Sequence, residues 1–344
     1  MNAEIKRIYV DILKEELAPA MGCTEPISVA YASALARKTL GRIPERVELS
    51  VSANIIKNVK SVVVPNTGGL HGIEAAASAG IVAGDSDKEL EVLSGVGTEQ
   101  IDEIKEYMAH TPIEVIATNG NCVFEIKVTV YGEDSFAVVH LAGDHTNVIH
   151  VERDGSVILH KDYSENGEAA KPYRDKLDIA SIVEFADEVD ICEIEETLTR
   201  QIEYNTAIAE EGLGGNWGAR IGRILLDSYG DSVSNRAKAM AAAGSDARMS
   251  GCELPVIINS GSGNQGMTVS LPVIEYAKEL GASREATPRA LAVSNLVAIH
   301  MKTGIGCLSA YCGATSAACG AAAGITYLYG GKAYAVSQIG RAHV

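Results

Sequence analysis

The chain has 344 residues, of which 47% are hydrophobic, and a formal net charge of −16. A chain of this length can bury a substantial core and is expected to form two domains. The negative charge argues against nucleic acids and anionic membrane surfaces as partners. No apolar run reaches the roughly 18 residues of a membrane span, and the N-terminus is charged and amphipathic, unlike a signal peptide. We therefore expect a cytoplasmic protein.

Charge and cysteine are unevenly placed along the sequence. Residues 230–344 carry nine Lys and Arg against six Asp and Glu, so the acidic excess lies in the preceding part. This C-terminal third is the part suited to an anionic small molecule. The seven cysteines are expected to be reduced in the cytoplasm, which leaves buried thiols or metal ligands as their roles.

The N-terminal half predicts helices and strands together. Two helices are expected in the first forty residues, joined at 18–26, with Thr24 capping a helix that begins near Pro26. Strict alternation of apolar and polar residues predicts a half-buried strand over 46–55. Further strands are predicted over 121–132 and 135–160, with a hairpin turn at Asp154–Gly155. Helices are predicted over 72–84 and 98–110.

The C-terminal half predicts helices alone, because no convincing strand pattern follows residue 175. Glycines mark the ends of the predicted helices, which cover 179–189, 194–212, 219–230, 234–251, 265–280 and 286–304. The expected architecture is an α+β domain over 1–170, with an antiparallel or mixed sheet. An all-helical domain of small-residue-rich helices follows over 171–344.

A glycine loop, NSGSGNQG, occupies residues 259–266 between an apolar segment and a predicted helix. Backbone amides at glycine and at a helix N-terminus can form a nest for carboxylate or phosphate. The loop lacks the Lys–Ser/Thr pair of a phosphate-binding P-loop, and a simple capped turn is an equal reading. Its candidate substrate-binding residues are Ser260, Gly261, Ser262, Gly263, Asn264 and Gln265.

Two other loops carry groups with chemical potential. In VPNTGGLHG, residues 64–72, Asn66 and Thr67 could hold the polar end of a substrate. His71 could act as an acid or base there, although a lone histidine is more often structural. In AMGCTEP, Cys23 falls at a helix start, where the helix dipole favours a thiolate. The segment 212–218 is glycine-rich as well and is interpreted as a helix connection.

The run of small residues over 306–324 contains Cys307, Cys312 and Cys319. Cysteine in such a run is either buried filler or a ligand for a soft metal. On one straight helix Cys312 and Cys319 share a face and Cys307 does not. A metal site here would need ligands from elsewhere in the fold.

Four motifs in this order, MGCTEP, NIIKN…VVVPNTGG, INSGSGNQG and SAYCGATSAACGAAAGITYLYGG, resemble the L-cysteine desulfidase family. That family is related to the alpha chain of iron–sulfur-dependent L-serine dehydratases, and the resemblance covers nearly the whole chain. It implies an oxygen-sensitive [4Fe-4S] cluster held by three cysteines, with one iron open. By this resemblance Cys312 is a cluster ligand, and Cys23 is a further ligand or a catalytic cysteine.

The resemblance implies α,β-elimination of L-cysteine to pyruvate, ammonia and sulfide, with the open iron acting as a Lewis acid on the β-sulfur. The candidate bases are Cys23, Lys57 and His71, and a lysine would need its pKa lowered by burial. The substrate would be oriented by the glycine loop and by groups near the other motifs, namely Thr24, Glu25, Asn66, Thr67 and Gly68.

One departure concerns the family motif CDGAK and a further cysteine, expected after the helix that starts near Gly331. The sequence ends at SQIGRAHV without them. We therefore expect a chain truncated relative to the functional protein, or one that does not hold the cluster as its relatives do.

Other readings stay open at this point. The same mechanism could dehydrate L-serine, which differs from L-cysteine in one heavy atom, oxygen in place of sulfur. Pyridoxal phosphate could run the same elimination through a lysine Schiff base. A binder of amino acids without a cluster, or an inactive relative, belongs to a different class. Besides the amino acid, the expected partner is a second copy of the chain in a homodimer.

Overall fold

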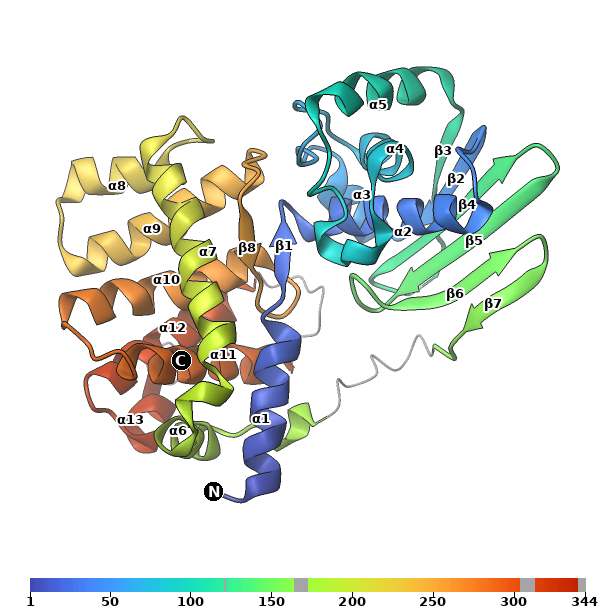
Figure 1. Ribbon diagram of the computed structural model, residues 1–344. Coiled ribbons are helices and arrows are strands. Elements are labelled where there is room, and N and C mark those ends of the chain that lie inside the picture. Colours follow the sequence, from blue (N-terminus) through green and yellow to red (C-terminus); the bar gives the residue numbers. More distant parts are fainter. Residues whose placement is uncertain (121, 164–172, 304–312, 340–344) are drawn as a thin grey trace. The chain divides into compact units, whose positions relative to one another are not determined.

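The computed structural model describes residues 1–120, 122–163, 173–303 and 313–339, which belong to two compact units (Figure 1). The first, here called the α/β unit, comprises Ala20–Ala169 and the short segment Met249–Glu253. The second, the helical unit, comprises Met1–Pro19, Ala170–Arg248 and Leu254–Val344. The sequence placed one border at residue 170. In the structure the chain also passes between the units near residue 19, because α1 belongs to the helical unit, and near residues 248 and 253, because Met249–Glu253 belongs to the α/β unit.

The α/β unit is built on a six-stranded mixed sheet with the strand order β3-β2-β4-β5-β6-β7. Strands β2 and β3 are parallel, and the other neighbours are antiparallel. The strands are β2 (Arg46–Val51), β3 (Ile113–Ala117), β4 (Glu125–Gly132), β5 (Ser135–Ala142), β6 (Val148–Arg153) and β7 (Ser156–His160). The helices are α2 (Thr24–Leu40), α3 (Ala53–Val59), α4 (Ile73–Ala83), the 3-10 helix η1 (Ser86–Glu91) and α5 (Thr98–His110).

One face of this sheet forms the core of the unit. Because side chains alternate along a strand, Val47, Leu49 and Val51 point to the same face, where they are fully buried. The paired strand β4 contributes Val128 and Val130 to the same layer. Helix α2, which is buried along most of its length, packs on β4, β5 and β6 and covers this face. The opposite face carries the polar residues of β2 and β4, such as Glu48 and Lys127, and on β5 it also carries the buried Val138 and Ala142.

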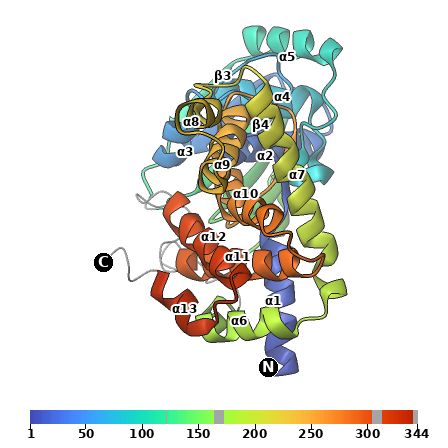
Figure 2. The same cartoon turned by 90° about the vertical axis from the view of Figure 1, so that its left-hand side faces the viewer.

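The helical unit has α1 (Ala3–Glu16) and a series of helices after residue 173. Figure 2 shows α10, α11 and α12 lying beside one another, and all three pack in pairs. The elements are η2 (Arg174–Lys176), α6 (Ile179–Glu188), η3 (Ile191–Glu193), α7 (Glu195–Gly214), α8 (Ile221–Tyr229), α9 (Val233–Met249), β8 (Pro255–Ile257), α10 (Gly263–Glu279), α11 (Ala286–Thr303), α12 (Ala314–Leu328) and α13 (Ala333–Gln338). Near β8, the Ile258 N–H donates to the Ala18 carbonyl at 3.0 Å, just before β1 (Pro19–Met21).

Glycine allows these helices to approach one another closely. A Cβ atom built on Gly212 of α7 would lie 2.1 Å from the carbonyl oxygen of Ala243 on α9. On α12, a Cβ at Gly320 would lie 2.5 Å from the Ser294 carbonyl oxygen of α11. Real Cβ atoms do not approach backbone oxygen this closely, because interiors are already close-packed. The abundance of glycine and alanine is therefore a packing requirement of the helical unit.

The predicted fold class is confirmed: a mixed sheet with helices comes first and a mainly helical part follows. The hairpin at Asp154–Gly155 is also confirmed, since both residues have positive φ and join β6 to β7. Among the described residues, no helix is both long and apolar enough to cross a membrane.

Three local predictions were wrong. The strand predicted over 46–55 ends at Val51, because α3 begins at Ala53. Helix α2 starts at Thr24 with Cys23 at the N-cap, so Thr24 is the first residue of the helix rather than its cap. Strand β8 lies in the half where no strand was expected. It has three residues, too few for a periodic pattern.

Two glycines of α7 test the packing argument. We expect Gly212→Ala to lower the free energy of unfolding by about 1–3 kcal/mol, because the new methyl group overlaps the Ala243 carbonyl. Gly214→Ala is the matched control, since a Cβ there meets nothing within 4 Å. It is expected to leave stability unchanged or to raise it by up to about 1 kcal/mol. Urea denaturation followed by circular dichroism measures both, and equal effects would contradict the close approach.

Candidate functional site

The glycine loop forms a tight turn between β8 and α10. The backbone N–H groups of Asn259 and Ser262 each donate to the other residue's carbonyl at 3.1 Å. The two residues at the tip, Ser260 and Gly261, both have positive φ. Ser262 is the N-cap of α10, and its hydroxyl accepts from the Gln265 N–H. The turn and the cap that the sequence suggested are both present, and α10 begins two residues before Gln265.

A single buried amide holds both ends of this loop. Asn205 of α7 is fully buried, and its Oδ1 accepts from the Ile257 N–H at 2.8 Å. Its Nδ2 lies within 3.3 Å of the Ile257 and Gly266 carbonyl oxygens and 3.0 Å from Ser270 Oγ. Gly266 has no side chain at a point where a Cβ would meet the Ile257 carbonyl oxygen at 2.0 Å. The start of α10 is thus fixed against the end of β8.

A second set of amides lies under the loop. Asn259 and Asn295 are fully buried, and Asn259 Nδ2 donates to Asn295 Oδ1 at 3.0 Å. Asn295 and Gln201 exchange two hydrogen bonds, at 2.8 and 3.0 Å. Buried amides that are bonded to one another in this way have one favoured arrangement. The loop therefore has a rigid base.

A buried arginine accompanies the first turn of α10. Arg248, at the end of α9, is 3% exposed, and its Nη1 donates to Asn264 Oδ1 at 3.0 Å. A Cβ on Gly263 would lie 2.4 Å from its Nε, so the guanidinium occupies space that a side chain would need. The Gly263 and Asn264 N–H groups lack intrahelical partners, as at any helix start. Guanidinium and helix dipole together favour an anion here.

Gln265 packs against Gly313 of the C-terminal segment. Its side chain is buried, and within the described residues its Oε1 has no hydrogen-bond partner. A Cβ on Gly313 would lie 2.2 Å from the Gln265 amide carbon, so the amide packs directly on the backbone of Gly313. Cys307 and Cys312 lie outside the described residues. Cys319 is half-buried on α12.

In the α/β unit, Glu25 gathers the groups of the MGCTEP motif. Its Oε2 accepts from Cys23 Sγ at 2.9 Å and from Thr24 Oγ1 at 3.3 Å. Its Oε1 accepts from Asn58 Nδ2 at 3.2 Å. Cys23 is buried at the N-cap of α2. In this geometry the sulfur is a hydrogen donor to a carboxylate, although the helix start by itself favours a thiolate.

The PNTGG loop packs on this motif. A Cβ on Gly22 would lie 2.1 Å from Pro65 Cγ, so the two segments are in direct contact. Thr67 is fully buried and donates to the Val64 carbonyl at 2.7 Å. Asn66 Nδ2 donates to the Leu93 carbonyl at 2.7 Å. Both side chains hold the shape of the loop, and their role in substrate binding stays a prediction.

The remaining candidates of this unit are at the surface. Lys57 on α3 and His71 are exposed, and His71 Nδ1 lies 3.4 Å from the Gly69 carbonyl oxygen. Gly68 is exposed, with positive φ. Of the three candidate bases, Cys23 alone is buried. The burial that a lysine base requires is not found at Lys57.

A [4Fe-4S] cluster requires thiolate ligands, and the described residues do not supply a complete set. The free cysteines among them are Cys23, Cys122, Cys192, Cys252 and Cys319. Within the described ranges, no group of three or more His, Cys, Asp or Glu side chains is placed to hold a metal ion.

The sequence reasoning missed Asn205 and Arg248 as parts of the site. Arg248 stands in the segment DARMSG, residues 246–251, where nothing in the local pattern marks it as buried. Its place next to Gly263 depends on how α9 packs on α10, which is a tertiary contact.

The glycine loop, the buried Arg248 guanidinium and the first N–H groups of α10 together form a candidate site for a small anion. The chain belongs to the serine dehydratase alpha-chain family, because the family model "Serine dehydratase alpha chain" matches residues 87–342. It is 57% identical to a UPF0597 protein of Desulfitobacterium hafniense over 94% of this chain and 75% of that one. It is 53% identical to a UPF0597 protein of Lachnoclostridium phytofermentans over 96% and 79% of the two chains.

Asn205 can be tested against its neighbour on α7. We expect Asn205→Leu to lower the free energy of unfolding by about 2–4 kcal/mol, because it leaves the buried Ile257 N–H and carbonyl groups without partners. Thr206→Val is the control, since the Thr206 hydroxyl is buried and forms no hydrogen bond within the described residues. Its removal is expected to be neutral or stabilising. Chemical denaturation measures the free energy of unfolding of both variants. A loss in Asn205→Leu no larger than that in Thr206→Val would refute the anchoring role.

Proposed function

We propose that the protein is an α,β-elimination lyase that converts L-cysteine to pyruvate, ammonia and sulfide. The family membership supports a lyase. The observation that carries the proposal is the first turn of α10, where the Arg248 guanidinium lies against Gly263 and the Gln265 amide lies against Gly313. These groups match the two charged ends of an amino acid.

The carboxylate of the substrate is assigned to the positive side of this turn. The Gly263 and Asn264 N–H groups and the nearby guanidinium favour a carboxylate over a neutral group. Gln265 Oε1, which is buried and unpaired within the described residues, can accept from the α-ammonium group. Because the loop is fixed by Asn205, these groups need little rearrangement when the substrate binds.

The elimination removes the proton from Cα and the sulfur from Cβ of L-cysteine. The resulting enamine reacts with water to give pyruvate and ammonia, and the sulfur leaves as sulfide. A [4Fe-4S] cluster with Cys312 as a ligand would supply a Lewis acid for the departing sulfur. The predicted bases are Cys23, Lys57 and His71. Cys23 donates to the Glu25 carboxylate at 2.9 Å, so that carboxylate would have to take the thiol proton before Cys23 could act as a base.

L-Serine dehydration is the second candidate, and the family description favours it directly. Both substrates carry the same carboxylate and ammonium groups, so the glycine loop does not distinguish them. The leaving atom alone differs. Sulfide release from L-cysteine and pyruvate formation from L-serine, measured on the same preparation, separate the two.

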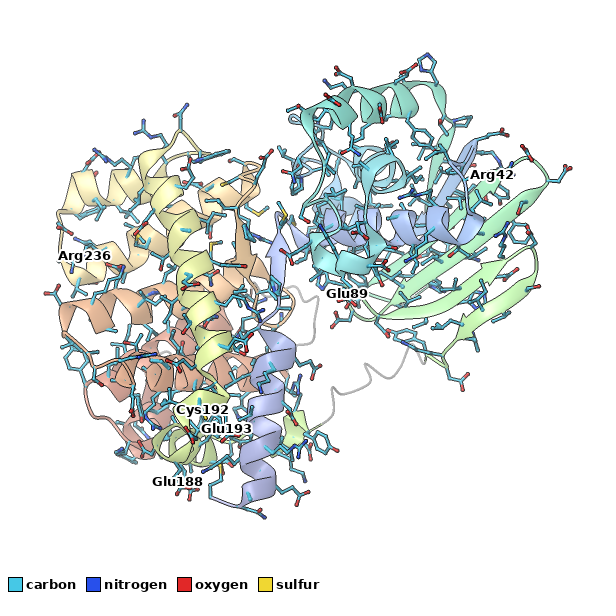
Figure 3. All side chains as sticks on the ribbon, in the orientation of Figure 1. Arg42, Glu89, Glu188, Cys192, Glu193 and Arg236 are labelled. Carbon is cyan, nitrogen blue, oxygen red and sulfur yellow. The ribbon has the colours of Figure 1, made fainter. Side chains whose placement is uncertain are left out.

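The role of Arg248 is tested by its removal in the full chain, prepared without air and reconstituted with iron and sulfide. We expect Arg248→Met to lower kcat/KM for L-cysteine by about 10–100-fold, since hydrogen bonds to charged groups contribute about 1.5–3 kcal/mol. Arg236→Met on the same helix is the control. Arg236 pairs with Asp231, Glu275 and Glu279 and lies at the outer edge of the helical unit in Figure 3. Equal kcat/KM values for both variants would exclude Arg248 from carboxylate binding.

The role of Cys312 is tested by iron content together with turnover. We expect Cys312→Ala to lose bound iron and sulfide release, because a cluster with one thiolate fewer is held poorly. Cys192→Ala should retain both, since Cys192 is exposed next to α6 (Figure 3). Undiminished turnover in Cys312→Ala after removal of iron would end the proposal. A yellow aldimine absorbance would favour pyridoxal phosphate, and amino-acid binding without turnover would favour a binder.

A further inference from the structure

Three histidines form a row across the α/β unit, away from the motifs described above. In the register of the sheet, His140 of β5 lies opposite His150 of β6, and His150 lies opposite His160 of β7. His140 also pairs with Lys127 of β4, whose side chain is exposed. The row therefore lies on the face of the sheet opposite the one that α2 covers.

The outer two members of this row face each other through the same ring atom. The Nδ1 atoms of His150 and His160 are 3.4 Å apart, and the ring planes are inclined at 80°. The other nitrogen of each ring faces a carboxylate. His150 Nε2 is 3.1 Å from Glu152 Oε2, and His160 Nε2 is 3.7 Å from Asp162 Oδ1.

The second ring nitrogen of each histidine lies near an acidic side chain. Glu152 Oε2 is within hydrogen-bond distance of His150 Nε2 and favours the tautomer with the proton there, which leaves a lone pair on His150 Nδ1. Asp162 Oδ1, at 3.7 Å from His160 Nε2, is too far for a hydrogen bond and leaves the His160 tautomer open. The 3.4 Å contact of the two Nδ1 atoms is therefore either a hydrogen bond from His160 to His150 or a place where both lone pairs can bind a metal ion.

The separation of the two nitrogens fits a metal ion. Metal–nitrogen bonds of 2.0–2.1 Å in a tetrahedral site place two ligand nitrogens about 3.3–3.4 Å apart. Histidines that bind metals usually donate their second N–H to a carboxylate, which is the role available to Glu152 beside His150. The His160 side chain is 63% exposed, so an ion can reach the pair from solvent.

We propose that His150 and His160 bind a divalent transition-metal ion, such as Ni²⁺, Cu²⁺ or Zn²⁺, through their Nδ1 atoms. Imidazole is a preferred ligand for these ions, whereas Mg²⁺ and Ca²⁺ prefer oxygen. Among the described residues these two imidazoles are the ligands of the proposed site, since no group of three or more His, Cys, Asp or Glu side chains there is placed to hold an ion. The site does not depend on the proposed lyase activity.

Calorimetric titration of the chelator-treated full chain with NiCl₂ tests the site, without iron reconstitution and with no activity measured. The wild-type chain is expected to bind one Ni²⁺ more than His150→Gln or His160→Gln. His110→Gln is the control, because His110 is exposed and contacts the Glu106 carbonyl oxygen through Nδ1. Glu152→Gln is expected to keep the site with about 10–100-fold weaker affinity. MgCl₂ should give no binding heat.

The same titration can overturn the proposal. Equal Ni²⁺ stoichiometry and affinity in the wild type and in both histidine variants would mean that the two rings are joined only by a hydrogen bond. Far-ultraviolet circular dichroism of the metal-free variants verifies that each is folded, which is expected because both rings project from one face of an intact sheet. The thiols are common to all variants, so the difference between chains reports the histidines alone.

Discussion

The start of α10 depends on one buried side-chain amide, that of Asn205. Burying an amide is unfavourable unless its hydrogen bonds are formed, and here every bond reaches an element that flanks the glycine loop. Ile257 is held through both its N–H and its carbonyl group, and Gly266 through its carbonyl group. Asn205 therefore fixes Ile257 and Gly266 relative to each other, which restricts the conformations open to the loop residues 258–265 between them.

A loop fixed in this way can keep charge in a protein interior. Arg248 is buried within a chain whose net charge is −16, and a buried guanidinium is costly without partners. Asn264 supplies one of them, and the absence of a side chain at Gly263 supplies the room. Arg248 is one of the nine basic residues that give the segment after residue 230 its excess of positive charge. Anion binding here would rest on local structure rather than on the overall charge, which is repulsive to anions.

Patterns of local origin were predictable from the sequence, and contacts between distant segments were not. The alternation of apolar and polar residues predicted β2 and β4, and the Asp154–Gly155 pair predicted the hairpin turn, where both residues have positive φ. Strand β3 is a half-exposed edge strand whose sequence, IEVIA, does not alternate apolar and polar residues, and β8 is too short for any pattern. The contact of Arg248 with Gly263 exists through helix packing alone. The histidine row depends on the register of three strands, and bulges near His140 and Val151 shift that register. The ten-residue spacing of the histidines in the sequence therefore could not reveal that they lie side by side.

The small residues around the cysteine motif have two different physical causes. Gly320 and Gly324 of α12 make room for the backbone carbonyl oxygens of α11, which is helix packing. Gly313 makes room for the Gln265 amide, whose oxygen is buried without a hydrogen bond in the described part of the chain. A buried unpaired oxygen costs about 1–3 kcal/mol, and packing alone would favour an apolar side chain at that position. An ammonium group that donates to Oε1 would recover this energy when it binds, and this is the contact that the proposed substrate site assigns to Gln265.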